Sequence, residues 1–114
     1  MSVTPNLGLE LVPSNSLQPS VSINDAFQLI DALLQLVVVS STVTTPPATV
    51  AGDVGKRWVV PSGATGAWSG KTNAIALCTG VNLWRFITPA NGWRADRLTD
   101  SKVIRFNGTT WVAL

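Results

Sequence analysis

The feature that most constrains the fold is an apolar segment from Ser22 to Val39, whose hydrophobic residues recur with helical spacing. One row of side chains follows the alternating four- and three-residue spacing of a coiled-coil seam and consists of Ile23, Phe27, Ile30, Leu34 and Val37. A second row, formed by Ala26, Leu29, Leu33 and Leu36, lies to one side of the first. A surface helix of a small monomer needs one apolar stripe, so two stripes predict two partners. We assign one stripe to the chain's own β-domain and the other to copies of this helix in neighbouring subunits.

Charge is scarce and unevenly placed along the chain. Charged residues make up 12% of the sequence, about half the usual share in soluble proteins, and a subunit buried in an assembly tolerates that better than a monomer does. Residues 1–49 contain three acids and no Lys or Arg, whereas residues 50–114 contain eight Lys or Arg and three Asp, a net charge of +5. A basic half attracts anionic partners such as phosphorylated glycans, nucleic acid or acidic protein surfaces. The simpler alternative is that these charges solubilise exposed strand faces.

The changes in composition divide the chain into four segments. We predict an extended docking arm at residues 1–21, an oligomerisation helix at 22–39, a linker at 40–49 and a Trp-rich β-domain at 50–114. Three prolines exclude a helix from the arm, yet it carries the apolar residues Leu7, Leu9, Leu11 and Val12. We expect these residues to dock on a neighbouring protein, for example by adding a strand to a sheet edge. A floppy terminus with incidental leucines is the alternative.

Turn residues and tryptophans recur throughout the C-terminal half and predict short strands. The expected strands span residues 57–60, 73–79, 83–88, 93–97, 103–106 and 109–112. The predicted fold class is therefore α+β, with an extended N-terminal arm, one long assembly helix and a small antiparallel β-meander of five to six strands. Asn107-Gly108 is a strong signal for a two-residue hairpin turn, which places Ile104 opposite Trp111.

Residues for catalysis or metal binding are few. The chain has no histidine or tyrosine, and its single cysteine, Cys78, falls in an apolar strand where a packing role is expected. Asp96 and Asp100 have the spacing of ordinary turn residues rather than of paired catalytic acids. Without histidine or a cysteine pair no zinc site forms. We therefore predict no catalytic residues, no metal, no cofactor and no enzyme activity.

The five tryptophans all fall in the β-domain. We assign Trp58, Trp84 and Trp111, which lie in strands, to the core. Trp68 and Trp93 lie in loops or turns, and they are our candidate ligand contacts, for example to a host-surface glycan, with core packing as the alternative. Nucleic-acid binding is not expected, since no recognition helix or RNA-binding motif is present. The helix is too short and too polar for membrane insertion.

An ordered series of small motifs resembles a tailed-bacteriophage module of uncharacterised function. The matching residues on the helix are Asn24-Asp25-Ala26 and Ile30-Asp31-Ala32-Leu33. Those in the β-domain are Pro46-Pro47, Gly52-Asp53, Val59, Gly66-Ala67-Trp68-x-Gly70, Trp84-x-Phe86, Pro89, Gly92-Trp93 and Asn107-Gly108-x-x-Trp111. The resemblance covers about residues 18–113. The sequence departs from the family pattern at Pro19, where the family has lysine, and at Asp25, where it has glutamate.

The resemblance implies a structural virion protein, made in the host cytoplasm and associated with tail fibres, tail tips or other external phage structures. Combined with the two-stripe helix, it leads us to expect a homotrimer. The arm would anchor each subunit to a neighbouring virion protein and the β-domain would face outward in a tail fibre or host-receptor contact device. A capsid decoration or cement protein is the first alternative, and a carbohydrate-binding module is the second. The family has no established catalytic residues to carry over.

Overall fold

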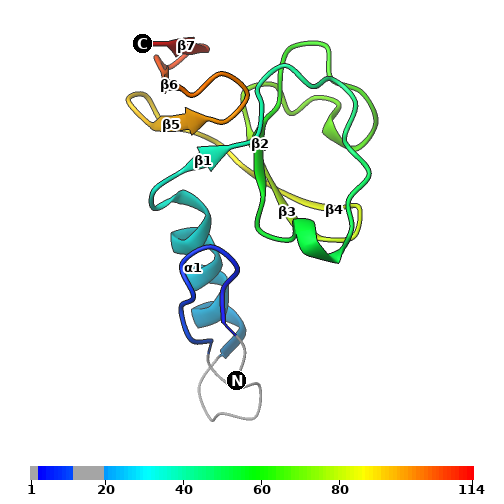
Figure 1. The fold of residues 1–114 in the computed structure, drawn as a ribbon, viewed down its shortest axis with the longest axis vertical. Coiled ribbons are helices and arrows are strands. Elements are labelled where there is room, and N and C mark those ends of the chain that lie inside the picture. The colour runs from blue at the N-terminus through cyan, green and yellow to red at the C-terminus, as the bar shows by residue number, and fades with distance from the viewer. Residues whose placement is uncertain (1–2, 12–19) are drawn as a thin grey trace. The chain divides into compact units, whose positions relative to one another are not determined.

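The computed structural model describes residues 3–11 and 20–114, which belong to two compact units (Figure 1). We call Met1–Gln35 the N-terminal unit and Leu36–Leu114 the β-unit. The N-terminal unit contains helix α1 (Ser20–Leu33). The β-unit contains β1 (Val37–Val38), η1 (Ala51–Asp53), β2 (Arg57–Val59), η2 (Gly66–Trp68), β3 (Ile75–Gly80), β4 (Leu83–Ile87), β5 (Arg94–Arg97), β6 (Lys102–Phe106) and β7 (Trp111–Ala113). The α+β class is confirmed, and the described residues form seven strands rather than five or six, because β1 was not expected.

Helix α1 ends at Leu33, not at Val39, so the predicted C-terminal boundary is wrong. The Leu34 amide closes the last helical bond on Ile30 at 2.9 Å, and Gln35 then adopts a positive φ of 57°. A left-handed residue just after the last turn is a common way to end a helix. The β-branched Val37 then lies in β1, where such side chains are favoured. Consequently the helical seam stops at Leu34 and does not include Val37.

The N-terminal arm is not extended in the described residues but folds into a tight turn. Val3 pairs with Glu10 as an isolated antiparallel bridge, and the Thr4 and Leu9 main chains bond at 2.9 Å. Gly8 has a φ of 71°, a conformation that glycine adopts without strain. Residues 3–11 form no helix, as the prolines predict, whereas Ser20 and Val21 of the predicted arm already belong to α1. The composition does not reveal the turn. Of the residues assigned to docking, Val12 lies outside the described residues.

The turn is attached to α1 by one buried carboxylate. Asp31 accepts the Leu7 amide at 2.5 Å and the Asn6 amide at 2.9 Å, and it also bonds the Thr4 side chain. Desolvation, the largest single effect, raises the pKa of Asp31, but the hydrogen bonds together outweigh it and hold the pKa below its ordinary value of 3.8. The carboxylate therefore stays ionised at neutral pH and acts as the clamp that holds the arm on the helix.

The β-unit is built from two sheets rather than one meander. One sheet has the order β1-β5-β6-β7 and the other has the order β2-β3-β4. All strand pairs are antiparallel except β1 with β5, in which Val37 pairs with Asp96. The expected meander is thus correct within β2–β4 and within β5–β7. It is wrong between β4 and β5, which lie in different sheets, and for β1, whose partner β5 is distant along the chain.

Residues 36–40 are shared by both sheets. On one side, the Leu36 and Val38 carbonyls accept amides of Asp96 and Leu98 at 3.0 and 2.9 Å. On the other side, the Val39 amide donates to the Arg57 carbonyl at 2.7 Å and the Ser40 carbonyl accepts the Val59 amide at 3.1 Å. This short segment therefore joins the two sheets through main-chain hydrogen bonds.

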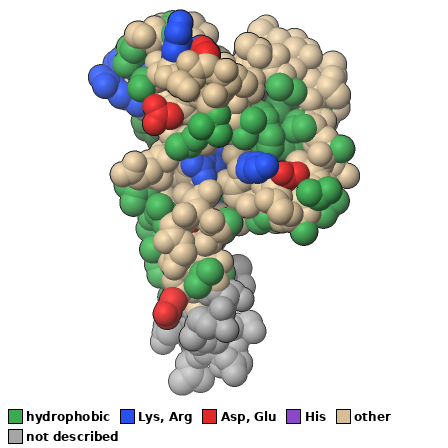
Figure 2. Space-filling view, in the orientation of Figure 1, with side chains coloured by type: hydrophobic (Ala, Val, Ile, Leu, Met, Phe, Trp, Pro, Cys, Tyr) green, Lys and Arg blue, Asp and Glu red, His purple; other side chains and the backbone are tan. Residues whose placement is uncertain are grey.

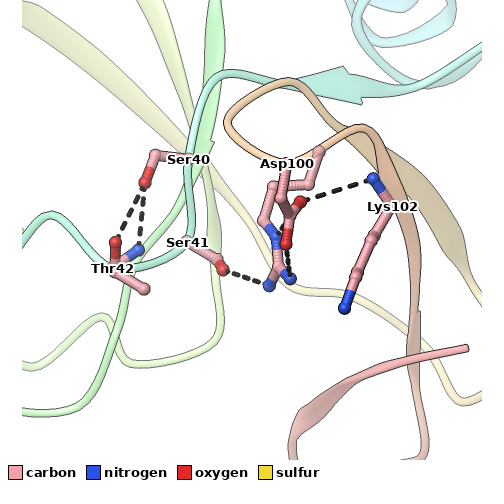
Figure 3. A network of polar contacts seen from close by, with 6 residues as sticks. Ser40, Ser41, Thr42, Asp100 and Lys102 are labelled. Carbon is pink, nitrogen blue, oxygen red and sulfur yellow. Dashed lines mark hydrogen bonds and ion pairs between the residues drawn. The ribbon is translucent and has the colours of Figure 1, made fainter.

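A network of polar contacts holds residues 40–42 against the end of β5 and the turn that follows it (Figure 3). The Arg97 guanidinium donates to Ser41 Oγ at 3.0 Å and to both carboxylate oxygens of Asp100 at 2.9 and 2.6 Å. The hydrogen bond from Arg97 is the main reason why the pKa of Asp100 lies below its ordinary value. Thr42 in turn bonds Ser40 Oγ through its amide. The network links the linker residues to the β5–β6 turn.

Three tryptophans belong to a hydrophobic cluster of the β-unit. Trp58, Trp68 and Trp84 contact one another with ring centroids 5.1–6.3 Å apart, mostly edge to face. Cys78 is buried in the same cluster, as predicted, and its thiol donates to the Gly80 carbonyl. Aromatic pairs in such geometries stabilise a core beyond the burial of their area.

The β6–β7 hairpin forms, but with a different register from the one predicted. Phe106 pairs with Trp111 and Ile104 with Ala113. The loop contains four residues, 107–110, because the Asn107 side chain accepts the amides of both Thr109 and Thr110 at 2.9 Å. A side chain that satisfies two loop amides stabilises this longer turn.

Across the described residues, no helix is long and apolar enough to cross a membrane.

Candidate functional site

A concave surface of the β-unit lies where the end of β4, the start of β3 and the 107–110 loop meet. Asn73, which has a φ of 71°, joins these parts through two hydrogen bonds. Its side-chain amide donates to the Thr109 carbonyl at 2.8 Å, and its own carbonyl accepts the Trp111 indole N–H at 2.9 Å. We call this pair of bonds the Asn73 bridge.

Two hollows flank the Asn73 bridge. The first, of about 410 Å³, is lined by Gly70, Lys71, Thr72, Asn73, Ala74, Phe86, Thr88, Pro89, Phe106, Gly108 and Thr109. The second, of about 370 Å³, is lined by Ser41, Val59, Val60, Pro61, Ser62, Thr72, Asn73, Thr109, Thr110 and Trp111. Hydroxyl and amide groups beside aromatic rings are suited to a ligand that presents both hydroxyl groups and apolar ring faces.

Charge in the first hollow comes from a lysine. Among the described residues that line it, Lys71 is the only charged one, and its ammonium lies 5.2 Å from the centroid of the Phe86 ring. A cation over an aromatic face is held in place without losing its charge. The first hollow can therefore attract a negative group while its threonines and Asn73 offer hydrogen bonds.

The prediction that Trp68 contacts a ligand is wrong. Its side chain has an exposed fraction of 0% and packs between Trp58 and Trp84. The loop that carries Trp68 forms η2 and turns the ring inward, which the glycine-rich sequence around it does not reveal. A tryptophan with no exposed surface cannot touch a ligand.

Trp93 and Trp111 are both half-buried. Trp93 is half-buried just before β5, and it is not among the described residues that line either hollow. Trp111, which the sequence assigns to the core, has its ring centroid 5.5 Å from that of Phe106 and also lines the second hollow. Sequence reasoning missed the site because its centre, the Asn73 bridge, joins residues 36 and 38 positions apart.

The described residues predicted for assembly lie on α1, directly after it at Leu34, in β1 at Val37, and in the N-terminal turn. Ile30 and Leu34 expose 46% and 57% of their surface, whereas Ile23 and Phe27 are half-buried. In the turn, Leu7 is exposed and Leu9 and Leu11 are half-buried. Within the seam, the most exposed apolar side chains are therefore those at the C-terminal end of α1, Ile30 and the following Leu34.

Metal and acid–base chemistry find little support in the geometry. In residues 3–11 and 20–114, no three histidine, cysteine or acidic residues lie close enough together to hold a metal ion. Asp53 and Asp100 are held in ion pairs with Lys56 and Arg97 at 2.7 and 2.6 Å.

Comparison with protein families gives one match, which spans most of the chain. Residues 23–112 match the model of DUF2793, described as a protein of unknown function. The chain belongs to the DUF2793 family. Among curated proteins, no sequence matches this chain. The family match begins on α1 and ends in β7, so it includes the Asp31 clamp residue and both hollows of this DUF2793 member.

Proposed function

We propose that this protein is a structural virion protein of a tailed bacteriophage that assembles as a homotrimer. In this proposal α1 packs against its copies through the Ile23, Phe27, Ile30 and Leu34 seam, and the β-unit faces outward as part of a tail fibre or host-receptor contact device. The N-terminal arm, in its folded turn, contacts a neighbouring virion protein.

The observation that carries the proposal is the exposed apolar surface of a short helix. Ile30 and Leu34 follow each other on one face of α1 and are about half exposed, although burying such a side chain fully stabilises a fold by about 1.5–3 kcal/mol. The α1 hydrophobic row continues through half-buried Phe27. Association of helices removes this surface from water, and the low charge content of the chain is consistent with a subunit of an assembly.

The assembly prediction concerns the double substitution Ile30→Asp and Leu34→Asp. Placing two carboxylates in the seam should abolish the oligomer, because a buried unpaired charge is strongly unfavourable. Light scattering after gel filtration should give three times the 12.0 kDa chain mass for the parent and one chain mass for the variant.

The matched control is Leu83→Asp with Leu98→Asp, two leucines of the β-unit that each expose 61% of their surface. This control should remain oligomeric. A parent protein that is a soluble, folded monomer would contradict the proposal. Cryo-electron microscopy of the particle that carries the protein then separates a tail location from a capsid decoration role.

A second candidate function, glycan binding by the β-unit, is favoured by the two hollows at the Asn73 bridge. Their threonines, amide groups and the Trp111 ring suit a sugar ring, which has polar edges and an apolar face. This function is compatible with the first one, since a host-receptor contact device needs a ligand-binding surface.

The glycan prediction concerns Lys71→Ala, a change at an exposed side chain. On a glycan array the variant should bind acidic glycans roughly tenfold more weakly, the usual loss for a charge-assisted hydrogen bond. Lys56→Ala, which removes a lysine paired with Asp53 outside the two hollows, should leave binding unchanged. A parent protein that binds no glycan on the array would remove this candidate.

A further inference from the structure

Two arginines lie directly opposite each other on the outer face of the β5–β6 pair. Arg94 of β5 pairs with Arg105 of β6, and the next pair along, Ala95 with Ile104, is buried. Paired residues of neighbouring strands project to the same face, and successive residues alternate between faces. Both arginine side chains therefore project away from the core, on the face opposite Ala95 and Ile104.

Neither arginine has a carboxylate partner among the described residues. Arg105 Nη2 donates to Asn91 Oδ1 at 3.4 Å, and no hydrogen bond or ion pair involves the Arg94 side chain in residues 3–11 and 20–114. Asp96 lies on the same face but pairs with Val103 across the strands and forms no ion pair with either arginine in the described structure. On the inner face of the same strands, by contrast, Arg97 is held by Asp100.

Like charges directly opposite each other destabilise a strand pair. The chain has only eight positively charged residues, and two of them occupy this one cross-strand pair. Figure 2 shows Lys and Arg side chains over the β5–β7 region of the β-unit, with acidic side chains beside them. A bound anion between the two guanidinium groups would convert this repulsion into attraction.

Asn91 connects the arginine pair to the first hollow. A guanidinium group can only donate, so the oxygen of the Asn91 amide faces Arg105 and its NH₂ group remains a donor. That nitrogen lies 3.7 Å from the position that a Cβ on Gly108 would occupy, and Gly108 lines the first hollow. Asn91 therefore lies between Arg105 and the edge of the first hollow at Gly108. We call Arg94, Arg105, Asn91 and the hollow with Lys71 the cationic rim.

We propose that the cationic rim binds a polysaccharide that carries anionic groups, with Arg94 and Arg105 holding one carboxylate or phosphate and the hollow holding a neighbouring sugar ring. This inference rests on the proposed host-receptor contact and specifies the ligand class. Each guanidinium donates two hydrogen bonds in a planar fork that matches a carboxylate or phosphate. The hydroxyl-rich lining beside them matches a sugar better than a base.

Nucleic acid fits the cationic rim less well. Single-stranded nucleic acid is bound by a groove of positive charge together with exposed aromatic rings on which bases stack. Here the Phe86 ring in the hollow is covered by the Lys71 ammonium, and Trp111 lines the second hollow on the other side of the Asn73 bridge. A ligand with sparse charges and many hydroxyl groups therefore suits the surface better than one with a phosphate at every residue.

The experiment measures binding of the full chain to two matched pairs of polymers by biolayer interferometry. The first pair is polygalacturonic acid and its neutral methyl ester, and the second is phosphorylated dextran and dextran. The parent should bind at least one anionic polymer tenfold or more tightly than its neutral counterpart, with an affinity that falls as salt rises. The variant Arg94→Ala with Arg105→Ala should lose this preference, whereas Lys102→Ala, an exposed cation on the same two strands, should keep it.

A thermal melt of the double variant tests whether its loss of binding is due to a loss of folding. The double variant should melt at the same temperature as the parent or higher, because the repulsion is removed. The inference is overturned if the double variant binds like the parent or if the parent prefers neither anionic polymer. It is equally overturned if single-stranded DNA binds more tightly than both polymers, or if inorganic phosphate alone binds as tightly as they do. The oligomeric state and the location in the virion are measured by other experiments. A failure of the binding test would therefore contradict the polysaccharide proposal and leave the assembly proposal unaffected.

Discussion

Replacing Trp68 with alanine is expected to lower the free energy of unfolding of the β-unit by about 3–5 kcal/mol, the usual cost of removing a fully buried aromatic ring. The ring has an exposed fraction of 0% and touches Trp58 and Trp84, so its removal leaves a cavity at the centre of the cluster. Urea unfolding monitored by tryptophan fluorescence should show the transition shifted to a much lower concentration.

Two further variants show whether the loss comes from the ring itself. Trp68→Phe should cost distinctly less than Trp68→Ala, because it keeps an aromatic ring and the Trp68 indole N–H has no hydrogen-bond partner to lose among the described residues. Trp93→Ala, at a half-buried position, should also cost less. If Trp68→Ala and Trp93→Ala had equal effects, the central role of Trp68 in the core would be refuted.

Replacing Asp31 with alanine is expected to release the N-terminal turn from α1. The substitution leaves the amides of Asn6 and Leu7 without their acceptor, a loss of about 1–3 kcal/mol for a buried hydrogen-bonded group. Hydrogen exchange at these two amides should accelerate by one to two orders of magnitude, while exchange in β3 stays unchanged. Asp31→Asn, which keeps one acceptor oxygen, should give an intermediate rate, and unchanged exchange in both variants would argue against the clamp.

Acid should have the same effect as this substitution. The pKa of Asp31 in the folded state lies below its ordinary value of 3.8, so the carboxylate contributes its full stability above that pH. The contribution is lost as the pH falls through the lower, folded-state pKa. Exchange at the Asn6 amide should therefore depend on Asp31 at neutral pH and become independent of it in strong acid.

The sequence was informative wherever structure depends on near neighbours. Prolines and turn residues located β2 to β7, and apolar spacing located α1, because these signals act over a few positions. The class of the fold follows from them. Burial of Cys78 was likewise readable from the apolar strand around it.

The errors arose where distant residues decide the outcome. Val37 and Val38 continue the helical pattern, but parallel pairing with Asp96 and Arg97 of β5 draws them into a strand. The hairpin register depends on how the Asn107 side chain satisfies two amides, which the Asn-Gly signal alone does not specify. The Asn73 bridge also joins residues that are far apart in the sequence, so the sequence alone did not predict it or the candidate site around it.

The segment shared by the two sheets also bears on how the β-unit folds. Residues 36–40 bond β2 on one side and β5 on the other, and β5 lies far along the chain. Contacts between residues distant in sequence cost loop-closure entropy before they add stability, which slows folding. On a nascent chain, residues 36–40 can therefore bond β2 early, whereas their hydrogen bonds to β5 cannot form before β5 has been synthesised.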